Sequence, residues 1–433
     1  MEKKNLLLEV VTHKLDKNPP GVFSICSANP MVLNASLKIA KDRSLSLLIE
    51  STCNQVNQFG GYMNMTPTDF IKYIKTLATN TDFPEEKIYL GGDHLGPSLW
   101  TNESAETAMA KAKRLVQDYV LAGYNKIHLD TSMACIDDIL PLPKQLIANR
   151  QAQLCQVAEE AKAHLDQKST QLLYVVGTEV PIPGGAMNEC DLLEVTSTKE
   201  TIENIQMTKE VFHEHGLDTA WERTIAFVVQ PGVEFSDTHV HAFDRNKASA
   251  LSELIKDYNN LVYESHSTDY QSRIQLKEMV EDHFAILKVG PALTFAMREA
   301  IFSLALIEKE LLFKRSASLS HVTETLDQAM IAKPVYWDKY YSGSVTERGF
   351  KRKYSFSDRC RYYWSEKQVT KAVHLLIDNL SNNSIPLSLI SQYLPIQYEE
   401  IRAGELLVNP LEMIYSKVNE IIKDYIFACN LDI

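Results

Sequence analysis

Residues 88–94 read Ile-Tyr-Leu-Gly-Gly-Asp-His, a short apolar run that ends on two ionisable side chains. From about residue 20 to residue 310, runs of this length alternate with longer segments of helical periodicity. Such alternation is typical of βα units around a parallel sheet. Eight runs are present, at residues 21–27, 45–51, 88–94, 126–132, 172–180, 224–232, 261–267 and 283–290. Because eight strands close a (β/α)8 TIM barrel, we predict this barrel for residues 1–332.

The segments between the runs carry the start and stop signals of helices. Thr66 and Pro67 place a hydroxyl cap before a proline at the first helical position, and Gly123 suits the end of an Ala- and Lys-rich helix. An open doubly wound sheet is the alternative architecture. It usually carries a glycine-rich dinucleotide-binding turn after its first strand, and residues 24–30 (SICSANP) have none.

The pattern changes after about residue 332. Eight tyrosine and tryptophan residues cluster between positions 336 and 364, and helical stretches follow at 366–381, 386–393 and 410–428. No long Gly- or Ser-rich linker separates this part from the preceding runs. We therefore predict that residues 333–433 form a mainly helical C-terminal extension that packs on the barrel.

Charge and cysteine content narrow the class of protein. The chain has 44 basic and 56 acidic side chains, a net charge of −12, and no run of Lys and Arg, which disfavours nucleic-acid and membrane-surface roles. The apolar stretch at residues 6–8 is interrupted by Glu9 and is too short for a signal peptide or a membrane span. Seven dispersed cysteines without a C-x-x-C pair predict a reduced, cytoplasmic location.

Nearly every predicted strand ends in polar or ionisable residues. Because burying an unpaired charge is costly, this many ionisable groups at one end of a core need partners, a metal or a ligand. In a (β/α)8 barrel the carboxyl ends of the strands form the active-site face. We therefore expect these side chains to converge on one site.

Four residues are the candidates for metal binding and proton transfer. Asp93 could move a proton and His94 could ligate a divalent metal, although His94 might equally hydrogen-bond across its loop. His266 is the best second imidazole, with a structural core histidine as the alternative. Glu179, in a loop stiffened by two prolines, could be a metal ligand or a general acid/base, or could cap the loop.

A second set of residues is predicted to bind substrate. Lys288 and Gly290, before a helix N-terminus, could hold phosphate, unless the lysine merely extends out of the barrel mouth. Asn54 and Gln58 suit polyol hydroxyls or a self-bonded loop. Arg359 or Arg361 could bind a phosphate with two hydrogen bonds or form an interdomain salt bridge. The ends of other runs complete the predicted set with Asp130, Gln230 and Asp269.

Several motifs, in one order along the chain, resemble the accessory (Z-type) subunit of the class II tagatose-1,6-bisphosphate aldolases of galactitol and N-acetylgalactosamine catabolism. They are CSANP (26–30), NQVNQFGG (54–61), GGDHLGP (91–97), KIHLD (126–130), GTEVPIPGG (177–185), VQPGVEF (229–235), ESHSTDY (264–270) and LKVGPALTF (287–295). SDRCRYYW (357–364) and SQYLP (391–395) extend the resemblance into the C-terminal region.

The resemblance implies two different activities. The family is usually described as a non-catalytic partner that stabilises and activates a separate aldolase chain, whereas some relatives are assigned as epimerases that interconvert fructose 6-phosphate and tagatose 6-phosphate at C4. In class II aldolases a strand-end Asp-His pair supplies the proton-transfer carboxylate and a zinc-binding imidazole, which Asp93 and His94 match. The sixth run departs from that pattern, because it ends at Gln230 where a histidine would be expected, while Glu179 could complete a different metal shell.

Our leading interpretation is an oligomeric, cytoplasmic barrel that assembles with a catalytic tagatose-bisphosphate aldolase chain and keeps its own zinc and sugar-phosphate pocket. The alternative is an autonomous, metal-dependent ketohexose-phosphate 4-epimerase that acts by retro-aldol and aldol steps. A scaffold with an empty relic pocket is the third class.

Overall fold

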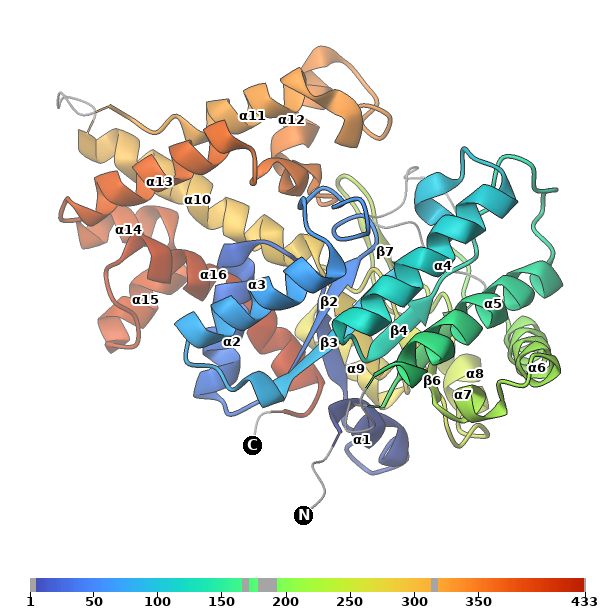
Figure 1. Ribbon diagram of the computed structural model, residues 1–433. Coiled ribbons are helices and arrows are strands. Elements are labelled where there is room, and N and C mark those ends of the chain that lie inside the picture. The colour runs from blue at the N-terminus through green and yellow to red at the C-terminus, as the bar shows by residue number, and fades with distance from the viewer. Residues whose placement is uncertain (1–4, 166–170, 178–192, 313–317, 432–433) are drawn as a thin grey trace.

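The computed structural model describes residues 5–165, 171–177, 193–312 and 318–431 (Figure 1). Eight of its strands form one closed parallel barrel in which the last strand pairs with the first. They are β1 (Val22–Ile25), β2 (Leu47–Thr52), β3 (Ile88–Leu95), β4 (Lys126–Leu129), β5 (Leu173–Gly177), β6 (Thr224–Val228), β9 (Val262–Ser265) and β10 (Ile286–Val289). Each lies within or overlaps one predicted run, so the predicted (β/α)8 barrel is confirmed.

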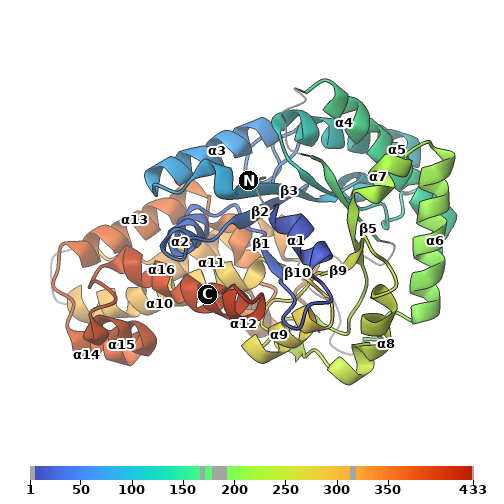
Figure 2. The ribbon, with the colours of Figure 1, turned by 90° about the horizontal axis from the view of Figure 1, so that it is seen from below.

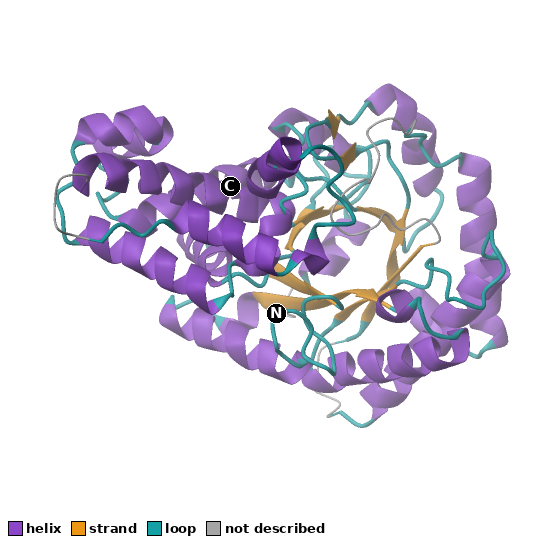
Figure 3. Ribbon diagram, turned by 90° about the horizontal axis from the view of Figure 1, so that it is seen from above, coloured by secondary structure: helices purple, strands orange, loops and turns teal. Residues whose placement is uncertain are grey.

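Helices enclose the ring of strands (Figure 3). The long ones that follow successive barrel strands are α2 (Pro30–Asp42), α3 (Pro67–Asn80), α4 (Ala105–Ala122), α5 (Lys144–Ala163), α6 (Thr198–Glu214), α8 (Arg245–Ile255), α9 (Arg273–Glu281) and α10 (Pro291–Leu312). The predicted signals work as expected: Thr66 and Asp69 form a capping box at α3. Gly123 ends α4 with a φ of 110°, in the left-handed region that glycine adopts most readily.

Smaller elements decorate the barrel. The short helix α7 (Asp218–Glu222) precedes β6, and the 3-10 turns η1 (Glu85–Lys87) and η2 (Pro97–Trp100) flank β3. The sequence analysis did not predict the antiparallel pair β7 (Glu234–Phe235) and β8 (Val240–His241), which lies between β6 and α8.

The amino end of the barrel is closed by an apolar plug. Helix α1 (Leu6–Thr12) lies under the barrel and covers its centre when the molecule is seen from below (Figure 2). Its buried residues Leu7 and Val10 share one apolar cluster with residues near the amino ends of the strands, including Val22, Leu48 and Val262. This end of the barrel interior is therefore an ordinary hydrophobic core.

The C-terminal part is helical, as predicted. Its elements are α11 (Val322–Ala332), η3 (Pro334–Tyr336), α12 (Val345–Tyr354), η4 (Arg359–Tyr363), α13 (Lys367–Ser381), α14 (Leu387–Tyr393), α15 (Pro395–Ala403) and α16 (Pro410–Ala428). Helix α16 packs against α2, α9 and α10, so the last helix of the chain covers the barrel itself. The predicted division between residues 332 and 333 stays a prediction. Among the described residues, no helix is both long and apolar enough to cross a membrane.

Candidate active site

Buried charges fill the barrel interior above the apolar plug. The Lys126 ammonium on β4 lies 2.7 Å from Oε1 of Glu50 and 2.6 Å from Oε2 of Glu264, and all three side chains are fully buried. The Lys288 ammonium on β10 pairs with Glu50 and lies 2.9 Å from Oδ1 of Asp93. Burial opposes the charge of Lys126, but Glu264 and Glu50 outweigh it and raise its pKa. Both lysines are thus held as cations between carboxylates.

Gly91 provides the space for one of these carboxylates. A Cβ at Gly91 would lie 2.6 Å from Cγ of Glu50 on the neighbouring strand, which is too close for any side chain. The glycine on β3 therefore lets Glu50 extend across the interior toward the two lysines.

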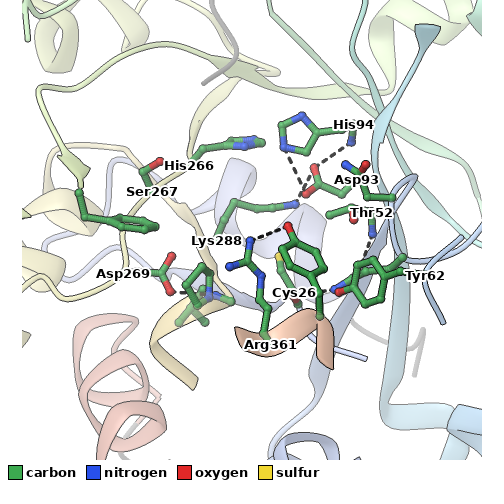
Figure 4. Close-up of a pocket in the computed structure, with 17 residues that line it drawn as sticks. Cys26, Thr52, Tyr62, Asp93, His94, His266, Ser267, Asp269, Lys288 and Arg361 are labelled. Atoms are coloured by element: carbon green, nitrogen blue, oxygen red, sulfur yellow. Dashed lines mark hydrogen bonds and ion pairs between the residues drawn. The ribbon is translucent and has the colours of Figure 1, made fainter. Parts of the chain in front are cut away.

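A local irregularity turns two consecutive residues of β3 into the same cavity. Successive residues of a regular strand point to opposite faces, so Asp93 and His94 would normally diverge. The register of β3 against β4 shifts between Gly92 and Leu95, and His94 has a φ of 51°. Both side chains consequently line the cavity at the carboxyl ends of the strands (Figure 4).

Three imidazoles meet at this end of the barrel. The ring centroids of His94 and His266 are 4.9 Å apart, and His128 on β4 lies 5.3 Å from the first and 5.1 Å from the second. All three side chains are buried. The structure thus brings together the two predicted imidazoles and adds a third.

Each imidazole has one ring nitrogen next to a carboxylate oxygen. The pairs are His94 Nδ1 with Asp130 Oδ2 (2.8 Å), His128 Nδ1 with Asp93 Oδ1 (2.8 Å) and His266 Nε2 with Glu264 Oε1 (3.1 Å). The other nitrogen of His128, Nε2, is buried and has no hydrogen-bond partner among the described residues. Imidazoles oriented by a carboxylate, with the second nitrogen unused, are the usual arrangement of metal-binding histidines.

These residues fit a divalent metal ion. One ligand atom from each of Asp93, His128, Glu264 and His266 lies within 4.8 Å of the other three. Burial lowers the pKa of His266 to about 4, so its imidazole is neutral and able to ligate at neutral pH. The formal charges of the buried groups also favour a divalent cation here, because they leave two negative charges. Four are carboxylates and two are ammonium groups: Glu50, Asp93, Asp130 and Glu264, and Lys126 and Lys288. Nitrogen and carboxylate donors of this kind suit zinc.

A cavity of about 90 Å³ opens onto the imidazoles of His94 and His266 (Figure 4). The predicted residues that line it are Asn54, Asp93, His94, His266, Asp269, Lys288 and Gly290. The C-terminal region contributes Arg361 and Tyr362 to the same wall. Residues from the first to the last third of the chain therefore share one cavity, as the sequence analysis expected.

Other predicted residues lie elsewhere. Asp130 and Arg359 line a neighbouring, wider cavity of about 730 Å³ that also reaches His94. The Gln58 amide donates to the carbonyl of Lys111 (3.1 Å). Oε1 of Gln230 accepts hydrogen bonds from two backbone N–H groups of its own turn, those of Gly232 (2.8 Å) and Val233 (3.0 Å). Glu179 lies outside the described residues, and its predicted roles stay predictions.

The groups predicted to bind phosphate are engaged within the protein. The backbone N–H groups of Gly290 and Ala292, at the start of α10, both donate to Oδ1 of Asp269 (3.0 and 2.8 Å). Burial raises the pKa of this carboxyl to about 6. The Lys288 ammonium faces Glu50 and Asp93. A phosphate role for Lys288 and Gly290 therefore stays a prediction.

The sequence analysis missed His128, Lys126 and Glu264, although a signal was present. Lys126, His128 and Asp130 recur at every second position, which places three ionisable side chains on one face of the strand. In an otherwise apolar run, that face is the barrel interior. Arg361 was considered beside Arg359, and it is Arg361 that reaches the cavity with the imidazoles.

The closed barrel and its imidazoles held by carboxylates define a (β/α)8 protein whose site, at the carboxyl ends of the strands, could hold a metal ion. Comparison with known proteins gives the family. The chain belongs to the D-tagatose-1,6-bisphosphate aldolase subunit GatZ/KbaZ-like family, whose model matches residues 7–430. The resemblance inferred from the sequence motifs is therefore confirmed.

One solved structure is similar to this chain over nearly the full length of both. The chain is 41% identical to a probable tagatose 6 phosphate kinase from Sinorhizobium meliloti 1021, with a TM-score of 0.86 over 94% of this chain and 100% of that chain. More distant likenesses include the YdjI aldolase from Escherichia coli K12 (9% identity, TM-score 0.43, 88% and 99% coverage). Another is the fructuronate-tagaturonate epimerase UxaE from Cohnella laeviribosi (7% identity, TM-score 0.47, 97% and 83% coverage). These two are too distant to bear on the reaction.

Proposed function

We propose that the chain is itself an enzyme, a metal-dependent 4-epimerase that interconverts fructose 6-phosphate and tagatose 6-phosphate. The observation that carries this proposal is that His94, His128 and His266 meet at the carboxyl end of the barrel, each held by its own carboxylate, and that His94 and His266 line the cavity there. Buried charge clusters contribute little to stability compared with apolar packing, so a mere scaffold gains nothing from this one. The site is better explained by chemistry.

His128 and His266, with Asp93 or Glu264, have ligand atoms close enough together to hold the metal, and the His94 ring lies beside them. Zinc is the best candidate for this ion. When bound, such an ion polarises a ketose carbonyl and makes adjacent hydroxyls more acidic. Asp130 and Glu264 hold two of the rings in fixed orientations through their hydrogen bonds. The chain's own contribution is thus a rigid donor set formed before substrate arrives.

Asp93 is our candidate for the proton transfer. Its Oδ1 is engaged by Lys288, His128 and the backbone N–H of His94. Its Oδ2 has no hydrogen bond among the described residues and lies 3.7 Å from Nε2 of His94, and Asp93 lines the cavity. Although burial works against the charge, His94 and Lys288 lower the pKa of Asp93 well below its usual range. Asp93 is therefore ionised at neutral pH and can accept a proton from an acidified hydroxyl.

These roles combine in a retro-aldol and aldol sequence. Asp93 takes the proton of the C4 hydroxyl, and the C3–C4 bond breaks, leaving an aldehyde and an enediolate in the cavity. The aldehyde turns its opposite face to the enediolate, the C3–C4 bond re-forms, and the proton returns to the C4 oxygen with inverted configuration. No atoms are gained or lost.

The second candidate is the role for which the family is named. As a subunit of a class II tagatose-bisphosphate aldolase, the chain would assemble with a catalytic partner in the cytoplasm and serve galactitol catabolism. The family match supports this role. In this role the chain would form an oligomer with its catalytic partner and bind a sugar phosphate.

The isolated chain distinguishes the two. After purification and loading with zinc, the 4-epimerase proposal expects fructose 6-phosphate to yield tagatose 6-phosphate, and expects D93N to abolish this while the exposed-surface variant D218N retains it. No product from the isolated chain, together with co-elution and a longer half-life of a co-expressed catalytic aldolase chain, would instead establish the accessory role.

A further inference from the structure

We infer that Arg361, which the C-terminal region delivers into the barrel mouth, forms the anion subsite for the phosphoryl group of the substrate. The inference rests on the proposed sugar-phosphate function. It concerns a part of the site that the barrel strands do not supply, because Arg361 belongs to η4 and reaches the cavity from outside the barrel (Figure 4).

The barrel itself has little positive charge to offer a ligand. The Lys288 ammonium is held between Glu50 and Asp93, and the first N–H groups of α10 donate to Asp269. These are the two kinds of group with which barrels commonly bind phosphate after their last strands. A phosphoryl group that enters this cavity must therefore find another cation.

The Arg361 guanidinium is anchored without being neutralised. It donates to the backbone carbonyls of Ser357 and Asp358 and to the hydroxyl of Tyr362 (2.8 Å), and its carbon lies 4.4 Å from the centre of the Tyr362 ring. No carboxylate in the described part of the chain forms an ion pair with it. Neutral acceptors fix its orientation and leave its full positive charge at the cavity wall.

Three of the four buried arginines in the described part of the chain are paired, whereas the fourth, Arg359, forms no ion pair there and lines the neighbouring, wider cavity. Arg150 lies 2.6 Å from Asp138, Arg352 lies 2.6 Å from Asp327, and Arg298 lies 3.8 Å from Asp358. Since an unpaired cation in a partly buried position is costly, a partner is expected at Arg361. A phosphoryl oxygen pair matches the guanidinium fork, which makes bidentate hydrogen bonds to such groups.

The fold fixes the position of η4 relative to the barrel. Asp358, directly before η4, has a φ of 45° and accepts a hydrogen bond from Thr294 in the first turn of α10. Arg298, one turn further along α10, lies on the other side of the same carboxylate. The helix that follows the last barrel strand thus holds the turn that carries Arg361, so the anion subsite and the imidazoles keep a fixed separation.

Inorganic phosphate is the probe that tests this subsite without any reaction. We expect titration calorimetry of the zinc-loaded chain to show that R361Q, which keeps an amide donor for the carbonyls but has no charge, weakens phosphate binding at least tenfold. R361K, which keeps a point charge, should show an intermediate loss. The matched control is R402Q, because Arg402 also lies over a tyrosine ring and donates to its hydroxyl (3.0 Å), but on the exposed surface of α15. Unchanged phosphate affinity in R361Q would overturn the inference.

Two further measurements, on R361K and on activity, keep the test of the subsite decisive. If R361Q unfolds, R361K decides alone. Wild-type phosphate affinity in R361K would then count against the subsite. Activity separates this inference from the proposed function: an anion subsite predicts a raised KM for fructose 6-phosphate with a smaller change in kcat. A chain that binds phosphate through Arg361 yet never converts fructose 6-phosphate would contradict the 4-epimerase and leave the subsite standing.

Discussion

The two ends of the barrel interior are both filled by buried side chains, yet these side chains have opposite chemistry. At the amino end, Leu7 and Val10 of α1 pack on apolar strand residues. At the carboxyl end, Lys126 lies between Glu50 and Glu264. Apolar burial stabilises a fold outright, whereas a buried ion pair repays little more than its own desolvation. The comparison teaches that stability is concentrated at one end and chemistry at the other.

The largest effect is expected where a charge loses its partner. K126M should lower the free energy of unfolding by about 3 to 5 kcal/mol, because Glu264 would lose its nearest cation, and Lys288, which pairs with Glu50 and lies 3.8 Å from Glu264, would have to face both carboxylates. Urea unfolding at neutral pH measures this change.

A second variant checks that the loss comes from charge. The double variant K126M/E264Q removes one of the stranded carboxylates, while Glu50 keeps its pairing with Lys288. It should recover part of the lost stability. A double variant no more stable than K126M would mean that the loss came from packing, and the contrast between the two ends would fail.

A smaller loss of stability is expected at the apolar end. L7A should lower the free energy of unfolding by about 2 to 4 kcal/mol, because Leu7 is fully buried under the barrel and its truncation leaves a cavity. Zinc content and phosphate binding should not change. The matched control is L15A, since Leu15 is 63% exposed and its loss should be nearly neutral. Altered zinc binding in L7A would show that the two ends are not independent.

The smallest expected effect is the pH dependence of stability that comes from His283, near the amino end of the barrel. Burial, with help from Lys256 and Lys14, lowers the pKa of His283 from 6.5 to about 4, while Glu253 acts in the opposite direction. The folded state therefore resists protonation that the unfolded state accepts, so stability is full above pH 6.5 and falls by about 2 to 3 kcal/mol as the pH drops toward 4. H283Q should flatten this slope in urea unfolding between pH 7 and 4. An equal slope in both proteins would refute the assignment to His283.

Much of the fold could be predicted from the sequence because its signals are local. Apolar runs, a hydroxyl cap at Thr66 and a glycine at position 123 each report on a few neighbouring residues, and the barrel follows from their number. The β7–β8 pair could not be predicted in the same way. Its two-residue strands are too short to carry a period.

The site was predictable in part for the same reason. Strand-end positions located Asp93, His94 and His266 on one cavity, because parallel strands bring their carboxyl ends together. The direction of the Lys288 side chain was not available from its position, since it depends on Glu50 from a distant strand. The face of β3 to which the His94 side chain points was not predictable either, because a shift in strand register and a positive φ determine it. Long-range pairing and backbone irregularity thus limit how much of the site can be predicted from the sequence.

The central claim is that the carboxyl end holds a divalent metal through its imidazoles, and the most direct test is the zinc content of the purified chain after equilibrium dialysis. We predict about one bound zinc per chain for the wild type, at least tenfold weaker binding for H128A, and wild-type binding for H241A, whose histidine lies on the β7–β8 pair outside the cavity. Equal zinc binding by wild type and H128A, or none by either, would contradict the account.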